Sequence, residues 1–273
     1  MKYAFSTLGL PGSSIAEAAA LAAEHGFDGV ELRAHAEEPL HPGTPNADRA
    51  AAVRTFAAAG VAVLAVAGYA KVAAAGDDDH VVAELLSLIV LAADLGAPFV
   101  RVFPGGGRLP EPEADTHAVR RLTAAAPFAE RHGVRILLET HDSHRTGAAA
   151  GRVLDRVGHP AVGALWDVLH TWLAGEQPDA SRRALAAHLG YVQVKDVASA
   201  TELTPIGLGD GVVPLAEAVA GTPADGWLCW EYEKRWHPDA AELPGRLARG
   251  RAHLARLAAA PGGRAAGRPP AAR

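Results

Sequence analysis

Short apolar runs alternate with Ala-rich amphipathic segments along this chain, and eight such alternations can be counted. An apolar run bounded by turn residues is typical of a buried strand, and a helically spaced segment that ends near a glycine is typical of a covering helix. The predicted strands cover residues 2–5, 29–32, 61–66, 99–103, 134–139, 162–167, 191–195 and 227–232. Eight βα units in succession predict an α/β fold of the (β/α)8 TIM-barrel class, with a single domain over residues 1–260.

An open, doubly wound sheet is the competing arrangement of alternating strands and helices. It usually has about five to seven strands and a glycine-rich dinucleotide turn after the first strand. Residues 7–12, Thr-Leu-Gly-Leu-Pro-Gly, match that turn poorly. With 273 residues, 49% of them hydrophobic, the chain is long enough to bury one large core. Residues 261–273 contain only Pro, Gly, Ala and Arg, so we expect a disordered C-terminal tail there.

Charge and hydropathy argue against several classes of partner. The formal net charge is −5 and the basic residues are scattered, so the sequence predicts no nucleic-acid partner. It has no apolar leader core and no run of about 18 apolar residues, so we expect no membrane segment. The single cysteine, Cys229, lies inside an apolar run, which indicates a core residue in a reducing compartment. We therefore expect a cytoplasmic protein.

Four apolar runs in the second half of the chain end in, or lead into, an acidic or amide side chain, namely Glu139, Asp167, Gln193 and Glu231. The carboxyl ends of barrel strands form one mouth, so these four groups are predicted to converge there. Four oxygen donors suit one divalent metal ion. Carboxylate and amide oxygens favour Mn²⁺ or Mg²⁺, and Co²⁺ or Zn²⁺ are also compatible with this set.

Six motifs extend this pattern, at residues 26–33, 138–142, 166–170, 192–196, 206–211 and 230–238. In their order and spacing, the chain resembles the xylose isomerase-like TIM-barrel superfamily, and within it the sugar phosphate isomerase/epimerase group, over roughly residues 2–258. The resemblance implies that Glu139, Asp167 and Glu231 bind one metal ion. Position 193 departs from the family, because it is Gln where His is usual, and an amide oxygen is a weaker donor than imidazole.

The same resemblance implies that Glu139 and Glu231 act as the acid and base on opposite faces of a bound sugar. His170 matches the family's Asp-x-x-His and would hydrogen-bond a substrate oxygen. Lys195, two residues after Gln193, faces the mouth and either stabilises an oxyanion or pairs with a glutamate. The charge run 233–237 is typical of a solvated loop.

Further side chains are candidates for substrate binding, namely Glu31, Arg33, Arg101, His141 and Trp236. Glu31 and Arg33 resemble family positions that hold a substrate hydroxyl or carboxylate, but a buried structural ion pair explains them almost as well. Arg101 is either an anion clamp in the pocket or a charge at the barrel floor. His141 either follows Glu139 into the site or turns away with the chain. The glycine-rich segments 105–107 and 207–211 either cradle an anion with backbone N–H groups or are simple turns.

The leading functional hypothesis is a metal-dependent isomerase or epimerase that acts on a sugar, keto-sugar or cyclitol by proton transfer through an enediolate. The first alternative is a metal-dependent dehydratase or lyase that uses the same metal and glutamates on a keto-polyol. A hydride-shift isomerase ranks lower, because it usually needs a second metal. A non-catalytic sugar-binding barrel is the remaining alternative. We expect a small sugar or polyol as the partner, and homodimerisation is compatible with this fold.

Overall fold

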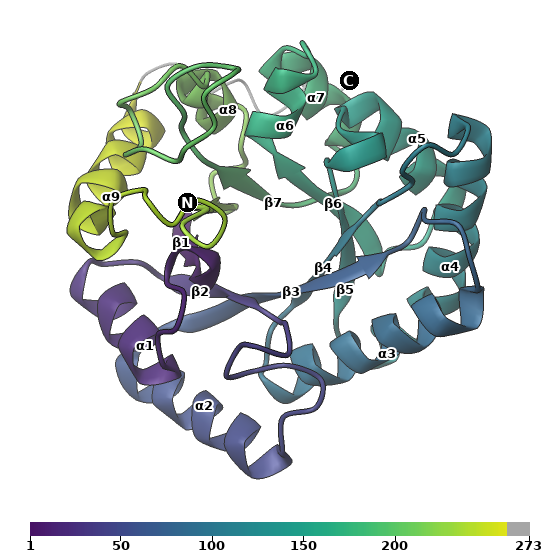
Figure 1. Cartoon of the computed structure of the whole chain (residues 1–273), viewed down its shortest axis with the longest axis horizontal. Helices are drawn as coiled ribbons and strands as arrows, with labels where there is room; N and C mark the ends of the chain where they lie inside the picture. The colour runs from purple at the N-terminus through teal and green to yellow at the C-terminus, as the bar shows by residue number, and fades with distance from the viewer. Residues whose placement is uncertain (261–273) are drawn as a thin grey trace, which may run out of the picture.

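The structure is a computed structural model that describes residues 1–260, and its strands form one closed parallel barrel in chain order (Figure 1). The strands are β1 (Lys2–Ser6), β2 (Gly29–Arg33), β3 (Ala62–Lys71), β4 (Phe99–Phe103), β5 (Arg135–Glu139), β6 (Val162–Asp167), β7 (Leu189–Val194) and β8 (Trp227–Trp230). β1 closes the barrel by pairing with β8, in a register that places Lys2 opposite Trp227. The predicted TIM barrel is therefore confirmed. The prediction made for residues 261–273 falls outside the described residues.

Helices surround the barrel in Figure 1, where they pack on the outer face of the sheet. They are α1 (Ile15–Glu24), α2 (Asn46–Ala59), α3 (Asp78–Asp94), α4 (Glu111–Arg131), α5 (Gly147–Val157), α6 (Val168–Leu173), α7 (Pro178–Leu185), α8 (Leu215–Ala220) and α9 (Pro244–Ala259). α1 starts with a complete capping box between Ser14 and Glu17. α2 ends at Gly60, whose φ of 68° is left-handed and favours glycine.

Two strands end two or more residues away from the sequence prediction, and both affect the mouth. β3 continues to Lys71 instead of ending at residue 66, because Lys71 pairs with Phe103 across an irregularity in the β3–β4 register. β8 ends at Trp230, so Glu231 is the first residue beyond the strand. Both mouth residues are thus carried by a rigid strand end.

The core has two layers. A small cluster fills the barrel interior, and its buried members are Ala4, Leu64, Ala65, Leu137, Leu165, Tyr191 and Cys229. A larger cluster lies between the sheet and the helices. The sulfur of Cys229 is therefore a packing group in the barrel interior, as the sequence predicted. None of the helices in the described part of the chain combines the length and the apolar character needed to cross a bilayer.

A buried arginine organises the connection between β3 and α3. Arg121 on α4 is fully buried and donates to the carbonyls of Val72, Ala74 and Gly76 at 3.0, 2.7 and 2.8 Å. Its Nε also donates to Asp78 at 2.8 Å. We expect Arg121→Met to lower the free energy of unfolding by about 2–4 kcal/mol, because three carbonyls and a carboxylate lose their donor. Chemical denaturation measures this loss.

Arg120 is the matched control for this prediction. It also contacts Asp78, but its side chain is 52% exposed. We expect Arg120→Met to cost less than about 1 kcal/mol, since exposed ion pairs contribute little. Equal losses in the two variants would show that the buried carbonyl contacts do not stabilise this loop.

Candidate active site at the barrel mouth

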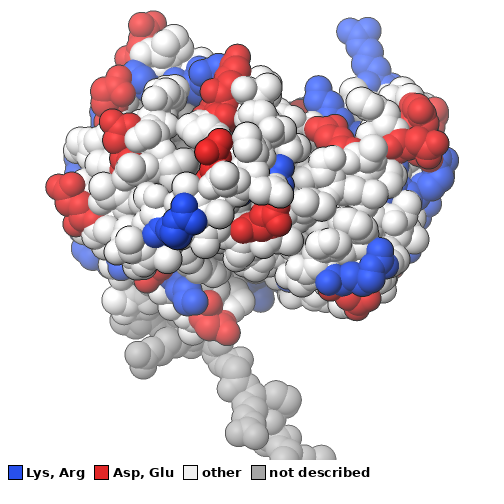
Figure 2. Space-filling view, turned by 90° about the horizontal axis from the view of Figure 1, so that it is seen from below, with Lys and Arg blue, Asp and Glu red and all other residues white. Residues whose placement is uncertain are grey.

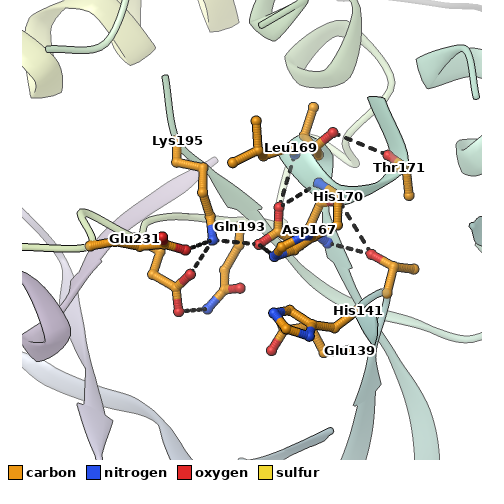
Figure 3. A network of polar contacts seen from close by, with 12 residues as sticks. Glu139, His141, Asp167, Leu169, His170, Thr171, Gln193, Lys195 and Glu231 are labelled. Atoms are coloured by element: carbon orange, nitrogen blue, oxygen red, sulfur yellow. Dashed lines mark hydrogen bonds and ion pairs between the residues drawn. The ribbon is translucent and has the colours of Figure 1, made fainter. Parts of the chain in front are cut away.

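The carboxyl ends of β5 to β8 bring the four predicted ligand side chains together (Figure 3). Glu139 and Asp167 are the last residues of β5 and β6, Gln193 lies near the end of β7, and Glu231 follows β8. All four are buried, with at most 4% of each residue exposed. The four side chains thus lie at one end of the barrel, and the binding of one metal ion by these four residues stays a prediction.

Asp167 is held in one orientation by its own helix. Its Oδ1 accepts hydrogen bonds from the backbone N–H groups of Leu169 and His170 at 2.9 and 3.3 Å, which caps α6. Its backbone N–H donates to Thr140 Oγ1 at 2.9 Å. Because Oδ1 is engaged in the cap, Oδ2 is the oxygen that faces the site.

Lys195 lies among three carboxylates (Figure 3). Its Nζ is 2.8 Å from Asp167 Oδ2 and 2.7 Å from Glu233 Oε1, and it also contacts Glu231 Oε2. Burial opposes the charge, but these carboxylates outweigh it and raise the pKa of Lys195 well above its ordinary value. The ammonium therefore stays charged. The interpretation of residues 233–237 as a solvated loop was wrong for Glu233, whose side chain turns back to this lysine.

Arg101 approaches the same cluster from β4. Its Nε lies 3.1 Å from Glu139 Oε2, and a terminal nitrogen lies 3.8 Å from Glu231 Oε1. Its other terminal nitrogen donates to the carbonyl of Gly68 at 3.0 Å, and Phe103 lies under the guanidinium at 4.1 Å. Arg101 thus connects the two glutamates from a fixed position.

Glu31 and Tyr191 lie behind Gln193 and orient its amide. Gln193 Nε2 donates to Glu31 Oε2 at 2.9 Å and to Glu231 Oε1 at 3.2 Å, and the Tyr191 hydroxyl also donates to Glu31. Since the amide nitrogen is engaged, the amide oxygen is left free. Tyr191 was not among the sequence candidates. The available signal was its spacing of two from Gln193, which places both side chains on the inner face of β7.

His141 and His170 flank Glu139. Their rings meet edge to face with centroids 4.0 Å apart, and one ligand atom from each histidine and from Glu139 lie within 4.8 Å of one another. Burial, with Lys195 and His141 nearby, lowers the pKa of His170 well below its ordinary value. For His141 burial acts in the same direction, but Asp142 and Glu139 outweigh it and raise the pKa. The chain after β5 therefore turns into the site.

Glu139 and Glu231 line a cavity of about 290 Å³, whereas Asp167, Gln193, His170 and Lys195 are not among its lining residues. Its lining residues are Leu8, Tyr69, Lys71, Arg101, Phe103, Glu139, His141, Asp142, Glu231, Glu233 and Trp236. Trp236 forms part of the outer wall and is 52% exposed. Glu31 and Arg33 are not among the lining residues, and Arg33 instead contacts Glu38 and donates to the Tyr69 hydroxyl at 2.7 Å. The cavity combines an aromatic wall with acidic and basic groups, which is typical of small-molecule sites.

Figure 2 shows one face of the molecule and the charges on its surface. In Figure 2 the upper rim of the molecule is hollowed between two raised parts. Basic and acidic residues are interspersed on the face shown there, without a continuous basic stripe.

The barrel and its acidic mouth are matched by one sequence family. The sequence matches the xylose isomerase-like TIM barrel over residues 19–257. The chain belongs to this family. None of the curated proteins matches the sequence at a significant level.

Solved structures share the xylose isomerase-like fold across nearly their whole length. The probable 3-DHS dehydratase AsbF of Bacillus anthracis is 19% identical, with a TM-score of 0.79 and coverage of 93% of this chain and 99% of that one. The IOLI protein with a bound zinc atom is also 19% identical, with a TM-score of 0.79 and coverage of 94% and 98%. D-psicose 3-epimerase of Clostridium cellulolyticum H10, solved with D-tagatose, is 16% identical, with a TM-score of 0.78 and coverage of 94% and 98%. At these identities the likeness shows the fold.

Side chains of this xylose isomerase-like barrel offer ligands for a divalent cation, and among residues 1–260 the carboxylate and histidine ligand atoms that lie within 4.8 Å of one another belong to Glu139, His141 and His170. Glu139 Oε2, Asp167 Oδ2 and Gln193 Oε1 are buried and accept no hydrogen bond within the described residues. Arg101 and Lys195 approach the two carboxylate oxygens as ion-pair partners, without hydrogen-bond geometry. Three buried acceptors from three strands therefore retain free lone pairs, which is the condition a hard cation satisfies.

The two glutamates hold their protons differently in this barrel. Burial raises the pKa of Glu139 to about 8 against the opposing effect of Arg101 and His141. Burial would also raise the pKa of Glu231, but Lys195 and Arg101 outweigh it and hold that pKa below its ordinary value. Neighbouring carboxyl groups whose pKa values are pushed apart are typical of acid–base pairs.

Proposed function

We propose that this chain is a metal-dependent isomerase or epimerase that acts on a sugar, keto-sugar or cyclitol. One observation carries the proposal: Glu139 and Glu231 reach one cavity from β5 and β8, with Arg101 between them. Glu139, Asp167, Gln193 and Glu231 would hold the ion, and their oxygen-rich set favours Mn²⁺ or Mg²⁺. When bound, the ion polarises a substrate carbonyl and so acidifies the neighbouring C–H bond.

The residues of the chain supply the proton transfers. Glu231, whose pKa is low, removes a proton from the carbon next to the carbonyl. Glu139 returns a proton from the β5 side, which inverts that carbon when the two glutamates face opposite sides of the planar enediolate. His170 and the Lys195 ammonium donate hydrogen bonds to substrate oxygens. These hydrogen bonds stabilise the negative charge of the enediolate.

Charge balance supports the roles of Lys195 and Arg101. Five carboxyl groups lie at the mouth or directly behind it, from Glu31, Glu139, Asp167, Glu231 and Glu233. Lys195 and Arg101 are the basic residues in direct ion-pair contact with this group among residues 1–260. The acidic groups therefore outnumber the basic ones, and a divalent ion would add positive charge to a site with an excess of negative charge.

Dehydration of a keto-polyol is the second candidate. His170 Nε2 is buried and has no hydrogen-bond partner in the described structure, so the tautomer with its proton on Nε2 would offer a donor to a leaving hydroxyl. The similarity in fold to a probable dehydratase is consistent with this alternative. A non-catalytic barrel would bind a polyol without changing it. The cytoplasmic location and the homodimer stay predictions from the sequence.

Two measurements separate these functions. Metal analysis of the purified protein should find about one divalent ion per chain. Candidate ketoses and keto-cyclitols are then incubated in D₂O with Mn²⁺ and followed by NMR. An isomerase or epimerase incorporates deuterium at the carbon next to the carbonyl, and a dehydratase gives an unsaturated product. Neither change with any candidate, in a metal-loaded protein, would contradict catalysis.

A further inference from the structure

A second hollow adjoins the reaction cavity at the ends of β3, β4 and β5. Its volume is about 360 Å³, and it is lined by Lys71, Gly105, Gly107, Asp142, Ser143 and Arg145. Lys71 and Asp142 also line the reaction cavity, so the two spaces share a wall. A substrate held at Glu139 and Glu231 therefore has room to extend toward Lys71.

The glycines of this hollow allow a close approach of three loops. Gly105 has a φ of 65°, and a Cβ at this position would lie 2.7 Å from the Lys71 side chain. A Cβ on Gly106 would lie 2.7 Å from Ser143 Oγ, which accepts a hydrogen bond from the Gly106 N–H at 3.0 Å. Glycine is thus required for Lys71 and Ser143 to lie against the loop after β4. If residues 105–107 were only a simple turn, their close contact with Lys71 would have no explanation.

A buried chain of polar contacts fixes Ser143 from below. Ser143 Oγ lies 2.9 Å from His144 Nδ1, and His144 Nε2 lies 2.9 Å from Asp115 Oδ1. Asp115 in turn accepts a hydrogen bond from Arg152 Nε at 2.6 Å. His144 and Asp115 are almost fully buried. The wall of the hollow is therefore preorganised, which lowers the entropic cost of binding a ligand there.

The hollow presents positive charge that the protein does not neutralise. Among residues 1–260, neither Lys71 nor Arg145 has an acidic side chain within ion-pair distance. The backbone N–H groups of Gly105 and Gly107 have no acceptor in that part of the chain. Asp142 is the opposing charge in the lining, and it lies 2.8 Å from His141 Nδ1, which offsets it.

We propose that this hollow, the anion pocket, binds a phosphate or carboxylate group at the end of the substrate remote from Glu139 and Glu231. The inference rests on the proposed function, because it assigns a part of the same substrate. Two cationic side chains and free backbone N–H groups are the donors that such oxyanions require. The substrate class is therefore an anionic keto-polyol.

Inorganic phosphate and acetate are the probes for this proposal, titrated into the full-length protein by calorimetry. Lys71→Met and Arg145→Met should each weaken binding of the preferred anion about ten-fold, because each removes a charge-assisted contact. Asp142→Asn should tighten binding about three-fold, because it removes an opposing charge, and Asn tolerates the positive φ of 44° at this position. Arg108→Met is the matched control. Arg108 is exposed on the same loop but outside the lining, so its loss should change the affinity by less than about two-fold.

The two probes distinguish the two sources of the charge. Tighter binding of phosphate identifies a phosphomonoester, and tighter binding of acetate identifies a sugar acid. Absence of binding of both anions to the wild-type protein, or equal affinity in Lys71→Met, Arg145→Met and wild type, would overturn the anion pocket. The anion titration involves no turnover. If anions bind but no ketose exchanges hydrogen, the anion pocket stands and the proposed function alone is contradicted.

Discussion

Replacing Glu139 or Glu231 with Gln is expected to lower solvent-hydrogen exchange at the carbon next to the carbonyl by about 10² to 10⁴. Gln keeps the size of the side chain and one oxygen donor, but it cannot accept or return a proton. Each variant should still take up Mn²⁺, although more weakly, because one charged ligand has become a neutral one. Single-turnover exchange in D₂O and calorimetric titration with Mn²⁺ measure the two effects separately.

Glu37→Gln is the control for this pair. Glu37 lies at the rim, with its side chain 52% exposed and in contact with Arg235, outside the cavity lining. We expect its exchange rate to stay within about two-fold of the wild type. Full exchange in both Glu139→Gln and Glu231→Gln, with metal bound, would refute a two-glutamate mechanism and point to His170, His141 or Lys195 as the base.

Lys195→Met is expected to bind Mn²⁺ about ten-fold to a hundred-fold more tightly than the wild type, and to exchange hydrogen more slowly. The Lys195 ammonium already occupies Asp167 Oδ2 and Glu231 Oε2, two of the proposed ligand groups, so an entering ion must displace it toward Glu233. A ten-fold change in affinity corresponds to roughly 1.4 kcal/mol. Repulsion between the Lys195 ammonium and a divalent ion a few ångströms away exceeds this value, even at the dielectric of a protein surface. Loss of the oxyanion donor lowers the rate.

Lys71→Met removes a lysine from the same mouth but touches none of these carboxylates, so its Mn²⁺ affinity should match the wild type. Calorimetric titration of the wild type, Lys195→Met and Lys71→Met with Mn²⁺ measures the three affinities. An unchanged affinity in Lys195→Met would place the ion away from this lysine, for instance between Glu139, His141 and His170, whose ligand atoms are also close together.

The eight strands could be predicted because each is a local pattern of apolar residues bounded by turns, and the parallel barrel follows from their number. Glu139 and Asp167 were found for the same reason, since a charge at the end of a buried strand stands out. Tyr191 and Glu233 were missed as members of the site. Their orientations depend on contacts that form only when β7, β8 and β2 close into a barrel, and the chain order of the residues does not reveal them.

Gln193 shows the limit of single-sequence reasoning most directly. The pattern predicted an amide at the ligand position but not which of its two polar atoms would face the site. That orientation is set by Glu31, which lies 162 residues earlier in the chain and on β2. Only the folded barrel brings the two side chains within hydrogen-bond distance.

The pairing of Glu31 with Gln193 also limits how this site can diverge. An imidazole at position 193 would meet the Glu31 carboxylate, which would draw one ring nitrogen away from the mouth and fix the tautomer of the other. The Tyr191 hydroxyl, which already donates to Glu31, would remain a second donor to that carboxylate from β7. Positions 31 and 193 therefore form a coupled pair. A lineage that changes the metal preference of this barrel through one of them must accommodate the other across the barrel interior.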